Sequence, residues 1–379
     1  MNKCLVTKLS GSTSNNELLR LGEMRIKLKK IISPSEKSQE LSIAVKKDTN
    51  LEIIGDGYFT DRGLSENRGK KVSIVAGSPQ SIFVSNNNLE IAILDKYSIL
   101  SIGINKNTGE QNMSICIDDL KYSNLLTYIG LLNTEVSGSI GSLKDCKNLT
   151  YIDLLKSSVY GDIASLKDIK SFTNINLSVT QTSGDISNLK NMTSLKSLSL
   201  YSTNVSGDIS NLKNMTSLTT LYLGNTNVYG DIGSLAGCKA LNIINVSNLT
   251  TPLTGEINAF QNIPNLKEVN LKYSRLSGDL ATLPASCKFA SFQNDSGSSF
   301  TWGTRASSSK IVAIEGNANL TNIDKMLQNQ AQCQVGFTSS DGVHYKTISV
   351  AGNRTSASDD AVATLQQKGY TILIAKSQV

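Results

Sequence analysis

Apolar residues recur along the middle of the chain in sets of three with the spacing L-x-x-L-x-L. Successive sets lie 23 residues apart, except for one two-residue insertion ahead of Gly255. The last two positions of a set are two residues apart, so on a short strand both side chains point into a core. The seven sets are Leu126, Ile129 and Leu131; Leu149, Ile152 and Leu154; Phe172, Ile175 and Leu177; Leu195, Leu198 and Leu200; Leu218, Leu221 and Leu223; Leu241, Ile244 and Val246; and Leu266, Val269 and Leu271.

Each set is followed by a return segment whose apolar residues are spaced by three. In one repeat they are Ile209, Leu212, Met215 and Leu218. A parallel β-helix would return with alternating residues, whereas a spacing of three predicts a 3₁₀ or helical turn. A single repeat of this size cannot offset the entropy lost on ordering its residues, so neighbouring repeats must stack on one another.

In the form LxxLxLxxTxVxGDIxxL, these residues resemble the leucine-rich repeat from about Leu126 to Leu283. The resemblance implies an α/β solenoid of seven 23-residue repeats with an N-terminal β-rich domain and a C-terminal strand-helix cap. Hydroxyl residues stand where many members of the family have asparagine, and we expect them to bond the backbone of the neighbouring repeat. They are Thr134, Ser157, Thr180, Thr203, Thr226 and Ser274.

An acidic column precedes the return turns. We expect these carboxylates to cap the turns, and the alternative is that they hold cations. The column consists of Asp162, Asp185, Asp208, Asp231, Glu256 and Asp279.

The flanking segments suggest three further parts. Residues 1–34 form a basic arm, residues 35–120 carry short β-like runs, the repeats occupy 121–286, and 287–379 form strand-helix units. Strands are predicted at 300–302, 310–316, 346–352 and 371–375, and helices at 321–332 and 358–369. These longer units would close the open end of the solenoid.

The net charge of +6 is concentrated near the N-terminus. We interpret the basic residues there as an arm that docks on a protein, because the nearly neutral remainder argues against nucleic acid as the main partner. The residues assigned to this docking arm are Arg20, Arg25, Lys27, Lys29 and Lys30. No apolar run approaches the roughly 20 residues that cross a bilayer, so membrane insertion is not expected. The apolar run at the start is also shorter than that of an export signal.

The composition argues against an enzyme. The chain has one histidine, His344, and its six cysteines form no CxxC pair. We therefore expect reduced core thiols, no metal site and no cofactor. A carboxylate-based polysaccharide-degrading enzyme remains an alternative, because Asp153 and Glu268 face the same side. At about 24 Å, five strand spacings, they are too far apart to act on one bond.

The exposed strand positions combine tyrosine with small polar residues, a composition typical of adaptable binding surfaces. We expect them to bind a protein or a glycan, and the alternative is an ordinary solvated sheet face. The predicted binding surface consists of Tyr128, Tyr151, Asp153, Tyr201, Tyr222, Glu268, Lys272 and Tyr273.

Both ends of the chain carry a second resemblance. The C-terminal stretch with FTW, IVAIEGNANLTNIDKML and KTISVAGNRTSASDDAVATLQQKGY is similar to the ends of leucine-rich-repeat proteins of Bacteroides-group bacteria and their tailed phages. The opening VTKLSGSTSNNELLRLGEMRI resembles the N-termini of virion proteins of crAss-like phages. The resemblance implies a virion-surface protein that is assembled in the host cytoplasm. A homo-oligomer formed through the N-terminal region is compatible with it. The protein would contact other virion proteins through its N-terminal region and a host surface glycan or protein. The alternative is a bacterial cell-surface adhesin.

Overall fold

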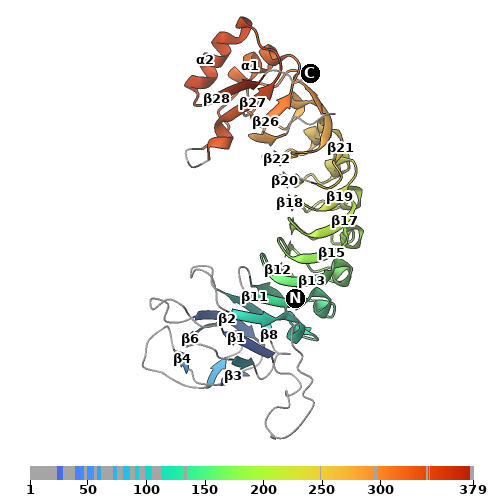
Figure 1. Ribbon diagram of the computed structural model, residues 1–379, viewed down its shortest axis with the longest axis vertical. Coiled ribbons are helices and arrows are strands. Elements are labelled where there is room, and N and C mark those ends of the chain that lie inside the picture. The colour runs from blue at the N-terminus through green and yellow to red at the C-terminus, as the bar shows by residue number, and fades with distance from the viewer. Residues whose placement is uncertain are drawn as a thin grey trace. The chain divides into compact units, whose positions relative to one another are not determined.

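The computed structural model describes residues 24–28, 39–46, 49–54, 58–60, 71–74, 80–85, 90–93, 99–104, 113–131, 135–247, 249–292, 298–338, 340 and 342–375 (Figure 1). The chain divides into two compact units, Met1–Gly184 and Asp185–Val379. Each unit is described by itself.

The first unit is built almost wholly from strands. Its strands are β1 (Met24–Leu28), β2 (Gln39–Val45), β3 (Thr49–Ile54), β4 (Tyr58–Thr60), β5 (Lys71–Ile74), β6 (Gln80–Ser85), β7 (Glu90–Ile93), β8 (Ile99–Ile104), β9 (Met113–Cys116), β10 (Tyr128–Gly130), β11 (Glu135–Ser139), β12 (Tyr151–Asp153), β13 (Ser158–Asp162), β14 (Asn174–Asn176) and β15 (Gln181–Asp185). Between them lie the 3₁₀ helices η2 (Ile117–Leu120), η3 (Ile140–Leu143) and η4 (Ile163–Leu166).

Antiparallel strands of the first unit lead directly into its parallel repeats. One sheet has the order β14-β12-β10-β8-β2-β6-β4 and the other β15-β13-β11-β9-β1-β7-β3-β5. Strands β8 and β9 pair in parallel with β10 and β11, and η2 follows β9. The stacked array therefore begins one repeat before residue 121. This repeat could not be recognised from the 23-residue spacing. Ile117 precedes its equivalent Ile140 by 23 residues, but Ile102 precedes its equivalent Ile129 by 27.

The second unit continues the repeats and ends in strand-helix units. Its strands are β16 (Ser197–Ser199), β17 (Asn204–Asp208), β18 (Thr220–Tyr222), β19 (Asn227–Tyr229), β20 (Ile243–Asn245), β21 (Thr254–Glu256), β22 (Glu268–Asn270), β23 (Arg275–Asp279), β24 (Phe289–Ser291), β25 (Ser299–Thr301), β26 (Ala313–Asn319), β27 (Thr347–Ala351) and β28 (Thr371–Ala375). The helices are η5 (Ile186–Leu189), η6 (Ile209–Leu212), η7 (Ile232–Gly237), η8 (Ile257–Asn262), η9 (Leu280–Thr282), α1 (Ile323–Ala331), η10 (Val343–Lys346), η11 (Ser356–Ser358) and α2 (Asp359–Gln367).

The apolar columns form a dry core in each unit. The inward residues of the sets, such as Ile129 and Ile152 in the first unit and Leu221 and Ile244 in the second, have no exposed surface. Their strands pair in parallel and in register, with Ile129 opposite Ile152 and Leu221 opposite Ile244. The return segments are short 3₁₀ helices, as their spacing predicts, and the strand-helix order of the C-terminal part is confirmed.

Aspartates cap the return helices. Asp208 Oδ1 accepts from the backbone N–H of Ser210 at 2.8 Å, and the same bond forms at Asp162, Asp185, Asp231 and Asp279. Glu256 makes no such bond, so the capping prediction is wrong at that position. The extra methylene of glutamate carries the carboxylate away from the position at which an aspartate accepts from the N–H two residues ahead.

The glycine of each Gly-Asp turn has a positive φ, and Gly184, Gly207 and Gly230 lie against the aspartate of the preceding repeat. Gly230 has a φ of 116°, and a Cβ there would lie 2.5 Å from Asp208 Oδ1. Only glycine fits, because any side chain would collide with the capping carboxylate.

Four residues of the hydroxyl column bond within their own repeat, contrary to expectation. Thr203 donates to the carbonyl of Leu200 at 2.7 Å, and Ser157, Thr180 and Thr226 bond the same way, three residues back. Thr134 lies outside the described residues.

The cysteine prediction is right for four residues and wrong for one. Cys146, Cys238, Cys287 and Cys333 are free and buried. Cys116 is disulfide-bonded, so not every cysteine is a reduced core thiol.

Candidate binding surface

In each unit, one face of the repeat sheet points away from the core. We call this the sheet face: the outward side chains of β10, β12 and β14 in the first unit, and of β16, β18, β20, β22 and β24 in the second. Its residues alternate with buried ones, as in β10, where Tyr128 is exposed and Ile129 is buried. All eight predicted surface residues lie on these strands or in the residues that directly follow them.

Three of the predicted residues come together in the first unit. The rings of Tyr128 and Tyr151 stack with their centroids 4.5 Å apart and their planes inclined by 10°. Tyr128 lies over Gly130, where a Cβ would be only 2.5 Å from the tyrosine oxygen. Parallel pairing of β10 with β12 places the two rings side by side.

Asp153 is held beneath this pair and is only 6% exposed. Its carboxylate accepts from the Tyr151 hydroxyl at 3.3 Å, from Asn176 Nδ2 at 3.0 Å and from the backbone N–H of Leu155 at 3.2 Å. Asp153 therefore positions Tyr151 and supplies charge, and its oxygens have little room for direct contact with a partner.

Burial and charge alter both phenols. Burial raises the pKa of Tyr151 to about 12, and the negative charge of Asp153 adds to the effect. The same two causes, in the same order, raise the pKa of Tyr128. Both tyrosines are therefore neutral hydrogen-bonding groups at any physiological pH.

In the second unit the predicted tyrosines are spread along the sheet face. Tyr201 accepts from Asn225 Nδ2 at 2.9 Å and lies over Gly224. Tyr222 is half-buried, and burial followed by the charge of Glu268 raises its pKa. Tyr273 is 42% exposed and has a φ of 64°, in the left-handed region.

The two charged residues predicted in the second unit are engaged in ion pairs. Lys272 Nζ lies 3.1 Å from Glu315 Oε2, and Glu268 Oε1 lies 4.0 Å from Lys288 Nζ. Glu268 also accepts from the Tyr345 hydroxyl at 3.1 Å. These contacts reduce the charge that Glu268 and Lys272 offer to a partner.

An aromatic cluster next to Glu268 was missed from the sequence. Phe289 lies against the rings of His344 and Tyr345, with centroids 5.6 and 5.2 Å away. Lys288 Nζ lies 4.7 Å from the centre of the Tyr345 ring. Tyr345 and Glu268 are 77 residues apart, and no repeat spacing connects them.

The docking arm is only partly described. Arg25 and Lys27 belong to β1, which pairs antiparallel with β7 and β9, so this part of the predicted arm is a strand of the first unit. Arg20, Lys29 and Lys30 lie outside the described residues.

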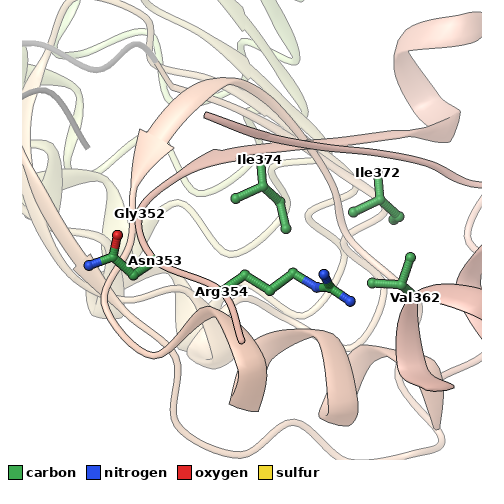
Figure 2. A pocket seen from close by; sticks show the side chains of 6 residues that line it. All are labelled: Gly352, Asn353, Arg354, Val362, Ile372 and Ile374. Atoms are coloured by element: carbon green, nitrogen blue, oxygen red, sulfur yellow. The ribbon is translucent and has the colours of Figure 1, made fainter. Parts of the chain in front are cut away.

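A shallow pocket lies at the end of the second unit, where α2 faces β28 (Figure 2). It has a volume of about 440 Å³ and is lined by Gly352, Asn353, Arg354, Val362, Ile372 and Ile374. Its one charged group, Arg354, already bonds Ser358 at 3.1 Å and pairs with Asp359. The pocket therefore combines the apolar side chains of Val362, Ile372 and Ile374 with Asn353 and an engaged cation, and it lacks the set of convergent polar groups that orients a substrate.

Across the described residues, no three potential ligands gather into a metal site. In the same part of the chain, no helix has the length and apolar character needed to span a bilayer.

No protein-family model and no curated protein matches the chain. Among solved structures it is similar to the leucine-rich-repeat ectodomain of the Arabidopsis thaliana membrane receptor kinase GASSHO1/SCHENGEN3 in complex with CASPARIAN STRIP INTEGRITY FACTOR 2. The identity is 18% and the TM-score 0.50, covering 68% of this chain and 33% of that one. It is also similar to the plant peptide hormone receptor RGFR1 in complex with RGF2, with 20% identity, a TM-score of 0.46, and 70% and 50% of the two chains covered.

A Listeria monocytogenes internalin, InlF, matches with 16% identity and a TM-score of 0.47, over 76% of this chain and 85% of that one. The chain spans a third to a half of the length of the two plant receptors. Together with the stacked parallel strands, the similarity to the GASSHO1/SCHENGEN3 ectodomain shows that the fold is a leucine-rich-repeat α/β solenoid.

Proposed function

We propose that this protein is a non-enzymatic interaction protein that binds a protein partner through its sheet face. The observation that carries the proposal is the stacked pair of Tyr128 and Tyr151 on an outward face, with Tyr128 37% exposed. Stacking and the bond to Asp153 fix both rings before a partner arrives, so little side-chain entropy is left to lose on binding.

The fold and the polarity of the surface support a protein partner. The receptor ectodomain whose fold this chain shares is in complex with CASPARIAN STRIP INTEGRITY FACTOR 2. The sheet face presents Asn174 and Asn176 in the first unit, and Ser197 and Thr220 in the second, all of them partly exposed. Such groups surround a buried aromatic anchor with adaptable hydrogen bonds, which is typical of protein interfaces.

The finer proposal is a component of a phage virion surface, with a host surface protein or glycan as the outside partner. The similarity of both ends of the chain to proteins of crAss-like phages and their Bacteroides-group hosts supports this placement. A bacterial cell-surface adhesin of the same repeat class is the competing assignment. Mass spectrometry of purified particles decides between them: the chain is expected in the particles, and its presence only in a bacterial surface fraction would overturn the virion assignment.

Binding itself is tested with purified capsid, tail and host surface proteins passed over the immobilised chain. Replacing Tyr151 by Ser removes a sheet-face ring, whereas Tyr160→Ser removes an exposed ring of β13, on the other sheet of the same unit. We expect the first variant to weaken binding at least about tenfold and the second to leave it unchanged. Equal binding by both variants and the native chain would contradict the proposed role of the sheet face.

A further inference from the structure

Strand β28 forms an edge of the sheet in the second unit. It pairs in parallel with β27 from Thr371 to Ala375, and no other strand of the described part of the chain pairs with it. The backbone N–H of Gly352 donates to the carbonyl of Ala375 at 2.9 Å, so Ala375 directs its peptide groups towards β27. These directions alternate along a parallel strand, and Ile372 and Ile374 therefore direct their N–H and C=O groups away from the sheet. Both residues leave a donor and an acceptor on the edge.

This edge lacks the features that usually keep edge strands from pairing. Natural edge strands are commonly blocked by a lysine, a proline or a bulge. The strand Thr371–Ala375 contains no charged residue and no proline, it pairs with β27 without a bulge, and Leu373 is 51% exposed. Lys368, just before the strand, is held by the carbonyls of Ala331 and Cys333. The strand is thus an uncharged template for a further strand.

The apolar rows beneath the sheet are incomplete at β28. Ile348 of β27 pairs with Ile372, and Val350 pairs with Ile374. The two residues of β27 are fully buried, whereas the two isoleucines of β28 are half-buried and line the pocket beside Val362 (Figure 2). A further strand that places apolar side chains next to Ile372 and Ile374 would bury both, which favours pairing through the hydrophobic effect.

We propose that this further strand is β28 of a second copy of the chain, in antiparallel orientation. With Leu373 opposite its own counterpart, Ile372 lies opposite Ile374 of the second copy. The peptide groups of these residues point outward in both copies, so each such pair exchanges both of its hydrogen bonds. On the pocket side, the row of Ile348 and Ile372 continues into Ile374 and Val350 of the second copy. The edge is therefore complementary to itself in its hydrogen bonds and in its apolar rows.

The same arrangement makes the two α2 helices complementary in charge. Helix α2 leads into β28 through the short turn at 368–370, so the helix and the strand run in opposite directions. Antiparallel pairing of the strands places the N-terminus of each α2 towards the C-terminus of the other. Asp359 and Asp360 lie in the first turn of α2, and Lys368 is its C-terminal cap. Opposite charges and opposite ends of the helix dipoles thus face each other across the pair.

The first test measures the mass of the full chain by sedimentation equilibrium over a series of concentrations. We expect the mass to rise from that of one chain, 40.7 kDa, towards twice this value. Leu373→Lys places two ammonium groups opposite each other and should weaken association at least about tenfold. Tyr229→Lys is the matched control, because Tyr229 is also a strand residue, is 45% exposed and lies on β19. It should associate like the native chain, and circular dichroism confirms that both variants are folded.

The second test probes the register. Directly opposite residues of a non-hydrogen-bonded pair have Cα atoms about 4.5 Å apart, a distance that a disulfide spans. Mild oxidation should therefore link Leu373→Cys into a dimer on a non-reducing gel. In Thr371→Cys the two introduced thiols would be about 13 Å apart, because Thr371 lies opposite Ala375 of the second copy, and no link should form. The native chain, in which Cys146, Cys238, Cys287 and Cys333 are buried, gives the background.

Amide hydrogen exchange follows the edge itself. The amides of Ile372 and Ile374 should gain protection as the concentration of the chain rises. The amide of Leu373 points towards β27 and should be protected at every concentration. A general change in stability would alter all three amides together, so this pattern is specific to pairing at the edge.

Each test can overturn the second copy. A mass of one chain at every concentration does so, as does equal association of folded Leu373→Lys and the native chain. Equal linking of Leu373→Cys and Thr371→Cys contradicts the register. If Ile372 and Ile374 gain protection only when another protein is added, and the mass of the chain alone does not rise, the edge binds a different partner and the proposal is wrong.

Discussion

The guanidinium of Arg305 donates to the carbonyl oxygen of Pro284 across 2.6 Å, in a part of the second unit where the arginine is 3% exposed. The same side chain bonds four further backbone carbonyls, those of Ala281, Leu283, Cys287 and Lys310. Arg305 thus donates hydrogen bonds to the backbone carbonyls of the irregular turns between the last 23-residue repeat and the strand-helix units. This buried cation is a structural group and needs no ligand.

Replacing Arg305 by Met should therefore destabilise the protein severely. Several buried carbonyls would lose their donor, and the free energy of unfolding should fall by at least about 3 kcal/mol. Urea denaturation measures the change, and the exposed Arg275→Met serves as control. A loss below about 1 kcal/mol at Arg305 would contradict this role.

The helix-capping role of the acidic column is tested by comparing Asp208, which caps a return helix, with Glu256, which does not. Asp208→Ala removes the bond to Ser210 and should cost about 1 kcal/mol, whereas Glu256→Ala should cost almost nothing because Glu256 caps no backbone group. Conversely, Glu256→Asp should gain stability by creating the missing cap. Thermal and urea unfolding of the three variants provide the comparison. Equal losses at Asp208 and Glu256 would show that the carboxylates act only through their charge.

Val179 is a β-branched residue with a φ of 56°, and it is 41% exposed. This conformation is costly for valine and well tolerated by asparagine. We expect Val179→Asn to raise the free energy of unfolding by about 1 kcal/mol. Lys156 occupies the equivalent position with a φ of 58°, so Lys156→Val should lower it. If Val179→Asn is neutral, the position is unstrained.

Alkaline pH should weaken the fold through its buried thiols. Burial raises the pKa of Cys146, Cys238 and Cys287 from 9.0 to about 11. Below pH 9 both the folded and the unfolded chain keep these protons. Between pH 9 and 11 the unfolded chain loses them first, so stability falls by about 1.4 kcal/mol per pH unit for each thiol. Urea titrations from pH 8 to 10.5 measure the slope.

In Cys238→Val the free energy of unfolding should fall less steeply with pH in the same titrations, by the contribution of one thiol, about 1.4 kcal/mol per pH unit. An unchanged slope would mean that this cysteine keeps an ordinary pKa in the folded chain.

The sequence predicts those features that depend on spacing along the chain. The seven apolar sets, the 3₁₀ returns, the aspartate caps and the strand-helix end all follow from periodicity and local propensity. The repeat at β8–η2 was missed because four extra residues between β8 and β9 break the 23-residue spacing. The hydroxyl column was placed correctly, but its partner was wrong, because the turn after each strand brings the carbonyl three residues back closer than that of the next repeat.

The candidate surface was only partly predictable, because spacing along the chain shows which side chains point outward and does not show their long-range neighbours. Outward positions follow from strand alternation, so Tyr128 and Tyr151 could be placed together. The groups that lie against the predicted surface residues could not be predicted. Asp153 is covered by Tyr151, and Glu268 accepts a hydrogen bond from Tyr345, which is 77 residues away in the sequence. Long-range contacts of this kind depend on tertiary packing, which no spacing in the sequence records.

The most direct test of the account compares two tyrosines of one repeat, Tyr222 of β18 and Tyr229 of β19, which belong to different sheets of the second unit. The measurement is the dissociation constant for the protein partner that the immobilised chain captures from purified capsid, tail and host surface proteins. The account predicts at least about a tenfold loss of affinity in Tyr222→Ser and less than about a twofold change in Tyr229→Ser. An equal effect of the two substitutions, or a larger one at Tyr229, would contradict binding through the sheet face.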